Sequence, residues 1–153
     1  MDSKLMEEID RKMMTIIRCV ISIRNAQIKK YGIIRGQLPF LIRISETPGI
    51  NQERLAYMLR MDKTTVAKVL RKLEEKKFII KVRSQEDNRK WLLYSAERLI
   101  SIYDELINLI ESSNKVLFKD FTDEEAETLY HLLNRIGQNV DEDWNSIIKN
   151  TNL

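Results

Sequence analysis

The sequence is poor in cysteine, histidine, glycine and proline. Cys19 is the single cysteine, so an intrachain disulfide is excluded. With 4 glycines and 2 prolines in 153 residues, the chain does not resemble a turn-rich all-β protein. One histidine, His131, is too few for a convincing zinc site even with glutamates nearby. No phosphate-cradling glycine loop and no nucleophile motif is present, so we expect no enzymatic activity, no metal and no cofactor.

Long apolar runs and a secretory leader are also missing. The most apolar early stretch, MMTIIRCVISI, is interrupted by Arg18 and is too short to cross a bilayer. No basic and apolar leader with a small-residue cleavage site opens the sequence. We therefore expect a soluble protein of the reducing cytoplasm without a membrane partner.

The charges are unevenly distributed along the chain. Lysine and arginine against aspartate and glutamate give +4 for residues 1–50, +6 for 51–95 and −7 for 96–153. A basic centre favours a module that binds a polyanion, and scattered surface charge is the alternative. The apolar share of 43% beside 32% charged residues is typical of a helical protein.

A helix-turn-helix is predicted near the centre. An amphipathic helix over 4–30 ends before Gly32, and a second helix covers about 37–46. Asn51 is suited to cap a short third helix, and Asp62 is suited to cap a fourth that runs to about Lys77. The outward face near the start of that fourth helix carries Thr64, Thr65 and Lys68. These side chains can contact base edges and phosphates, although an ordinary solvated helix face has the same composition.

A β-hairpin follows directly. Residues 78–83 and 90–94 are the only convincing strands, and the loop between them contains the sequence EDNRK. A helix-turn-helix followed by a hairpin is a winged helix. Arg89 at the loop tip can enter a minor groove, and Asp87 can hold its guanidinium in place.

Two long helices complete the chain. Ser95 is suited to cap a helix from Ala96 to about Lys119, and Thr122 with Glu125 forms a capping box for the last one. Their apolar stripes exceed what a small winged helix can bury, so we expect packing across a two-fold dimer. The predicted fold is mainly α, with residues 31–95 as a winged helix-turn-helix and residues 1–30 and 96–153 as dimerisation helices.

In order and spacing, these motifs resemble the MarR family of bacterial winged-helix transcription regulators. The resemblance rests on YGIIRGQLPFLIRISETPGINQERLA, MDKTTVAKVLRKLEEKKFI and EDNRK followed by YSAERLISIYDEL. It implies a homodimer on a pseudo-palindromic double-stranded DNA operator, most often as a repressor, with a small molecule as candidate effector. It places Thr64, Thr65 and Lys68 in the major groove and the Asp87-held Arg89 in the minor groove. The resemblance also implies that Arg35, Gln52, Arg83 and Lys90 contact DNA phosphates.

Three positions depart from the family pattern. Lys77 replaces a common glycine at the end of the recognition helix and is expected to take a left-handed conformation. Ala96 stands where a threonine is common, and Arg60 stands where a small residue is common in the bend.

Several alternatives stay open. Cys19 on the first helix can be an oxidant sensor, although an unreactive buried cysteine is the more ordinary interpretation. Trp91 and Trp144 are expected to be packing residues, with a ligand pocket as the alternative. A winged helix can also serve as a protein-interaction module without operator binding.

Overall fold

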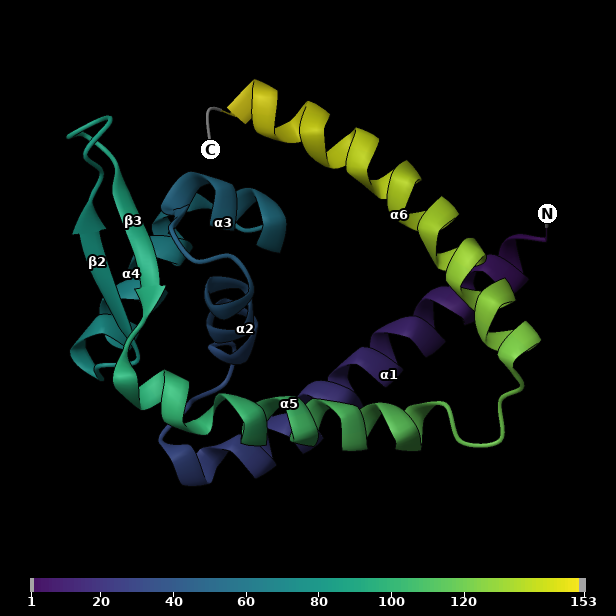
Figure 1. The fold of residues 1–153 in the computed structure, drawn as a ribbon. Coiled ribbons are helices and arrows are strands. Elements are labelled where there is room, and N and C mark those ends of the chain that lie inside the picture. The colour runs from purple at the N-terminus through teal and green to yellow at the C-terminus, as the bar shows by residue number, and fades with distance from the viewer. Residues whose placement is uncertain (1, 152–153) are drawn as a thin grey trace. The chain divides into compact units, whose positions relative to one another are not determined.

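The computed structural model describes residues 2–151 and is mainly helical, with one small antiparallel sheet (Figure 1). The elements in chain order are α1 (Ser3–Ile28), the 3-10 turn η1 (Lys29–Tyr31), α2 (Leu38–Glu46), β1 (Ile50–Asn51), α3 (Gln52–Leu59), α4 (Lys63–Glu75), β2 (Ile79–Arg83), β3 (Trp91–Ser95), α5 (Glu97–Leu117) and α6 (Asp123–Thr151). This order confirms the winged helix-turn-helix between long N- and C-terminal helices.

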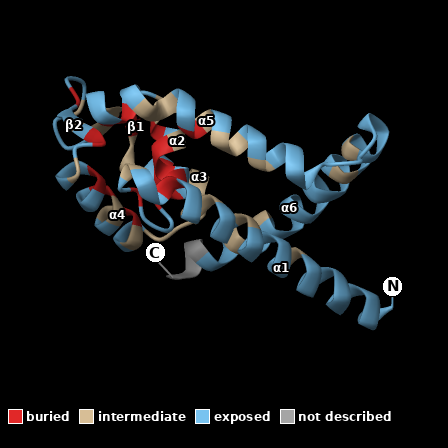
Figure 2. Cartoon of the chain, turned by 90° about the horizontal axis from the view of Figure 1, so that it is seen from below, coloured by how far each residue is buried: buried red, intermediate tan, exposed pale blue. Residues whose placement is uncertain are grey.

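The hydrophobic core lies within the winged helix itself, together with a few side chains of α1 and α5. Figure 2 shows the buried residues gathered on α2, α4 and the adjoining sheet, while most of α1 and α6 is exposed. The largest fully buried side chains include Phe40, Phe78, Leu55, Leu70 and Leu93. Burial of such side chains contributes about 1.5 to 3 kcal/mol each, so this cluster fixes the elements that carry the proposed DNA contacts.

The sheet has the order β1-β3-β2. In the hairpin, β2 and β3 pair from Ile79 with Ser95 to Arg83 with Trp91. The two expected strands are confirmed, but the expectation that they were the only ones was wrong. The two-residue strand β1 pairs with β3, an interaction too short for a period-2 pattern to reveal.

The start of α5 differs from the prediction. Ser95 is the last residue of β3, and its hydroxyl lies 2.9 Å from the hydroxyl of Ser45 on α2. The helix begins at Glu97, after the Ala96 N–H has donated to the Phe78 carbonyl at 2.9 Å. The proposed Ser95 cap was therefore wrong, because sheet pairing extends one residue beyond the predicted strand.

A residue in the left-handed conformation lies just after the end of α4. The helix ends at Glu75, two residues before the predicted end, and Lys77 has φ 59°. Its N–H donates to the Glu74 carbonyl at 2.9 Å, and the Phe78 N–H donates to Leu73 at 2.9 Å. This turn sends the chain into β2, and the left-handed conformation expected at Lys77 is confirmed.

The chain divides into two compact units, one ending at Ser113 and the other beginning at Asn114. In the first unit, α1 lies beside α5, because Arg24 Nε donates to Ser113 Oγ at 3.2 Å and the Tyr31 hydroxyl donates to Glu105. In the second, Thr122 and Glu125 exchange the two bonds of the predicted capping box at the start of α6, at 2.9 and 3.2 Å. No helix among the described residues is both long and apolar enough to span a bilayer.

Candidate nucleic-acid interface

The helix α4 presents a short polar surface near its N-terminus. Asp62 caps the helix by accepting the Thr65 N–H at 2.7 Å, as predicted, and Val66 faces the core. Thr64 and Lys68 are exposed, whereas Thr65 is half-buried. The Thr65 side chain is the main cause that lowers the pKa of Asp62, by hydrogen bonding to the carboxylate, and backbone N–H groups add to it. Thr64 and Lys68 are therefore the more accessible of the three predicted groove residues.

The bend between α3 and α4 contains a second left-handed residue. Arg60 has φ 52° and ends α3, which Asn51 begins by accepting the Arg54 N–H at 2.9 Å. The Arg60 guanidinium lies 4.5 Å from the centre of the exposed Tyr57 ring, and Nη1 donates to the Tyr57 carbonyl at 2.7 Å. The charge expected at this bend is present, and the Arg60 side chain that carries it is folded back on α3.

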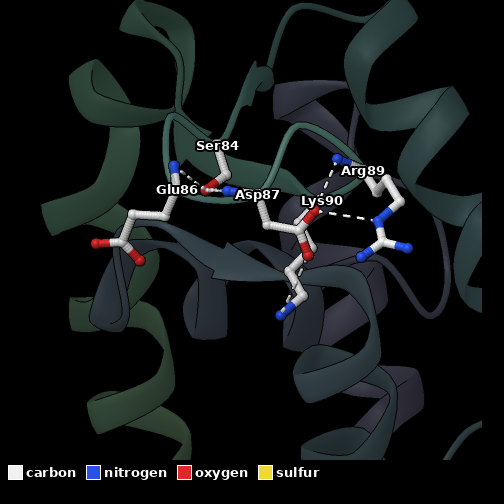
Figure 3. A network of polar contacts seen from close by, with 5 residues as sticks. All are labelled: Ser84, Glu86, Asp87, Arg89 and Lys90. Atoms are coloured by element: carbon white, nitrogen blue, oxygen red, sulfur yellow. Dashed lines mark hydrogen bonds and ion pairs between the residues drawn. The ribbon is translucent and has the colours of Figure 1, made fainter.

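The loop at the tip of the wing is organised by Ser84 (Figure 3). The buried Ser84 hydroxyl accepts the N–H groups of Glu86 and Asp87, each at 3.3 Å. The Ser84 N–H donates to the Lys90 carbonyl at 3.0 Å, and the Lys90 N–H donates to the Asp87 carbonyl at 2.8 Å. Ser84 was missed in the sequence, although a serine at the start of a loop is a known signal for such a turn.

Asp87 holds Arg89 in the way that its spacing predicted. The carboxylate oxygen Oδ1 accepts the Arg89 N–H at 3.1 Å and Nε at 3.4 Å, while Oδ2 lies 3.8 Å from Lys90 Nζ. The Arg89 backbone N–H is the main cause that lowers the pKa of Asp87. The side chain of Arg89 is 93% exposed against 30% for Asp87, so the carboxylate is drawn in while the arginine projects outward. Glu86 points away from this pair in Figure 3.

A cleft of about 350 Å³ lies between the wing and the start of α3. It is lined by Asn51, Gln52, Glu53, Asp87, Arg89, Lys90 and Trp91. Four of the nine predicted DNA-binding residues, Gln52, Asp87, Arg89 and Lys90, thus share one cleft. Gln52 also connects this cleft to the recognition helix α4, because the Gln52 Nε2 donates to the Lys63 carbonyl at 3.5 Å.

The other predicted residues lie around this cleft or apart from it. Arg83 faces Trp91 across the hairpin, with its guanidinium 5.2 Å from the ring centre. Arg35 is exposed in the turn before α2 and does not line the cleft. Trp91 is 46% exposed, so its prediction as a packing residue was wrong: at this end of the hairpin the strands extend beyond the core.

The alternative roles of Cys19 and His131 depend on their surroundings. Cys19 is exposed on α1, and His131 is exposed on α6 beside Tyr130, with their ring centres 5.6 Å apart. In the described part of the chain, no three histidine, cysteine, aspartate or glutamate residues come together as a metal site.

Comparison with known proteins agrees with this geometry. The model of the MarR family matches residues 33–91, which run from the turn before α2 to the first residue of β3. The uncharacterized HTH-type transcriptional regulator YybA of Bacillus subtilis strain 168 is 38% identical over 144 residues, which cover 94% of this chain and 96% of YybA. The chain belongs to the MarR family.

Solved MarR structures share the fold over nearly the whole chain. A Listeria monocytogenes protein of the family, solved in complex with 26mer DNA, is 33% identical with a TM-score of 0.87, covering 91% of this chain and 93% of that one. A MarR protein from Peptoclostridium difficile is 32% identical with a TM-score of 0.87, covering 96% and 94%. The chain is thus a winged-helix member of a family of DNA-binding transcription regulators.

Proposed function

We propose that this MarR-family chain is a sequence-specific regulator that binds double-stranded operator DNA as a homodimer. The observation that carries the proposal is Arg89, which is bound to Asp87 and yet 93% exposed at the tip of the wing. An arginine that is both oriented and exposed loses less conformational freedom on docking than one that moves freely. The minor groove attracts such a group, most strongly over narrow A·T-rich stretches.

The remaining contacts surround this anchor. Thr64 and Lys68, with Thr65 behind them, form the surface that α4 offers to base edges in the major groove. Gln52 and Lys90 in the cleft, Arg83 at the wing base and Arg35 before α2 are our proposed phosphate contacts. The net charge of +6 over residues 51–95 supports this assignment, because phosphate contacts supply much of the affinity for DNA.

A second copy of the chain is the proposed partner of the long helices. On α1, large apolar side chains such as Leu5, Ile16 and Ile23 are at least half exposed. On α6, the same holds for Tyr130 and Val140. Stripes of this size are rarely left in water, and a two-fold dimer presents two recognition helices to a pseudo-palindromic operator.

We further propose repression as the mode of action, relieved by a small ligand or another signal in the cytoplasm. An effector that binds more tightly to the conformation of the dimer that cannot bind DNA increases the population of that conformation, and the operator is released. The proteins matched above are named as regulators, which supports a role without catalysis.

Selection of binding sites from random duplex DNA tests the proposal. The winning sequences are expected to contain an inverted repeat with half-site centres about one helical turn apart. Arg89→Ala and Lys68→Ala are each expected to weaken binding by about 1 to 3 kcal/mol, and Lys115→Ala, outside the winged helix, serves as the control. Weak binding without sequence preference, unaltered by Arg89→Ala and Lys68→Ala, would instead favour a protein-interaction module.

A further inference from the structure

Arg83 and Trp91 form a pair that the DNA-binding assignment leaves unexplained. They lie directly opposite each other on β2 and β3, and the guanidinium carbon is 5.2 Å from the centre of the indole ring. Both side chains are exposed, the tryptophan by 46%. A large aromatic ring is costly to leave in water, so its position on the wing calls for a reason beyond packing.

The direction of the two side chains follows from the sheet. Side chains alternate along a strand, so Arg83 and Trp91 share a face with Ile79 and Leu93, each only 1% exposed. That face covers the core at one end of the hairpin and extends past it at the other. There Trp91 lines the cleft that also contains Gln52 and the tip of the wing.

The wing thus holds its two arginines by different means. Arg89 is held by a carboxylate, which offsets part of its charge. Arg83 is held by a neutral ring, and within the described residues no carboxylate lies at ion-pair distance from its guanidinium. A cation–π contact uses none of the guanidinium N–H groups as hydrogen-bond donors, so they stay available to oxygen acceptors.

We infer that Trp91 is a positioning residue whose ring contacts Arg83 and orients its guanidinium for a phosphate of bound DNA. This inference rests on the proposed function. In this proposal Arg89 enters the minor groove of the DNA, where the direction of its side chain matters most. Arg83 contacts the phosphate backbone of the DNA, where a positive charge that no carboxylate offsets contributes most to affinity.

A double-mutant cycle on the selected operator tests the inference. Trp91→Leu is expected to weaken binding about two- to fivefold per wing, the range for a partly exposed cation–π pair. Trp91→Phe, which keeps a ring, is expected to restore most of the affinity. Trp91→Leu is expected to add little once Arg83 has been changed to Ala, because the ring then has nothing to orient.

Two further measurements distinguish positioning from a purely structural role. Arg83→Ala is expected to make the plot of log affinity against log salt shallower by about 0.9 for each phosphate that the arginine neutralises in the wild type. Trp144→Phe leaves Trp91 as the only tryptophan. In that background, Arg83→Ala is expected to increase quenching of Trp91 fluorescence by acrylamide, because the ring loses its cover.

The outcomes separate the inference from the proposed function. If the wild-type protein fails to bind any selected DNA, both are overturned. If it binds, and the losses from Trp91→Leu and Arg83→Ala are additive or Trp91→Phe is no better than Trp91→Leu, the positioning role alone is overturned. Circular dichroism of each variant checks that the fold is retained.

Discussion

Lys77 carries backbone strain that a single substitution should relieve. Its φ of 59° lies in the left-handed region, which costs a residue with a Cβ about 1 to 2 kcal/mol, whereas glycine adopts it freely. We expect Lys77→Gly to raise the free energy of unfolding by about 1 kcal/mol, measured by urea denaturation at fixed protein concentration. Lys77→Ala is the control, because it removes the charge and keeps the strain. Equal stability of the two variants would contradict this explanation.

The Asp62 cap should make stability depend on pH in a defined direction. Hydrogen bonds from the Thr65 side chain, and then from backbone N–H groups, lower the pKa of Asp62 in the folded protein. A lowered folded pKa means that the charged cap stabilises the fold above the ordinary aspartate pKa. This stability is lost as the pH falls through the folded pKa.

Asp62→Asn isolates this dependence, because the amide still accepts a hydrogen bond and does not titrate in this range. Urea midpoints of the two proteins are measured from pH 7 to pH 3. The advantage of the wild type is expected to be constant near neutrality and to shrink below the ordinary aspartate pKa. A difference that does not change with pH would mean that the charge of Asp62 is irrelevant to the cap.

At the level of single residues, local spacing predicted some contacts and not others. The Asp87–Arg89 pair and the caps by Asn51 and Asp62 join residues two or three apart, so the sequence contains the whole interaction. The Arg83–Trp91 contact depends on the hairpin register, and a shift of one residue would place the two on opposite faces. Contacts of that kind become visible only once strand pairing is known.

Among the secondary-structure elements, Arg98 joins three segments at the start of α5. Nη1 donates to the Lys76 carbonyl at 2.8 Å, and Nη2 donates to the Tyr31 carbonyl at 2.9 Å. The guanidinium also lies 4.2 Å from the centre of the Phe78 ring, while Lys76 Nζ donates to the Gly32 carbonyl at 2.7 Å. The end of α4, the turn after α1 and the start of α5 are thereby fastened together.

Arg98→Lys should loosen this junction, because lysine lacks the planar fork that reaches two carbonyls. We expect a loss of about 1 to 2 kcal/mol in the free energy of unfolding, together with faster hydrogen exchange at the Gly32 and Phe78 amides. Arg54→Lys on α3 is the matched control. Unchanged exchange at both amides would show that the junction does not depend on Arg98.

Every α-helix was predicted, whereas one strand, β1, was not, and the reason is physical. A helix closes its hydrogen bonds within one segment, so caps and an apolar stripe describe it well. The last residue of β3, Ser95, pairs with Ile79, 16 residues earlier, and Leu92 and Leu93 pair with β1, 41 and 43 residues earlier. Partners this distant explain why the predicted Ser95 cap was wrong and why β1 was not predicted. The sequence therefore predicted that the wing exists, but the exact first and last residues of its strands could be defined only from the structure.

For the whole molecule, the exposed stripe of α6 makes dimerisation testable. Leu133 on α6 and Ile80 on β2 are matched in exposure at 47% and 49%, but only Leu133 lies on a proposed dimer helix. The wild type is expected to sediment at twice its chain mass of 18.2 kDa. Leu133→Glu is expected to shift it toward the monomer, because an unpaired carboxylate would be buried at the interface. Ile80→Glu is expected to remain dimeric.

The same pair of variants connects assembly to operator binding. A dimer places its second recognition helix at high effective concentration once the first has bound, so affinity for an inverted repeat exceeds affinity for one half-site by a large factor. Leu133→Glu should lose that advantage and bind the full operator and the isolated half-site about equally. Ile80→Glu should keep the advantage. A monomeric wild type, or a dimeric Leu133→Glu variant, would contradict the assignment of α6 to the interface. A Leu133→Glu monomer that still preferred the full operator would show that the two half-sites are not read by a two-fold dimer.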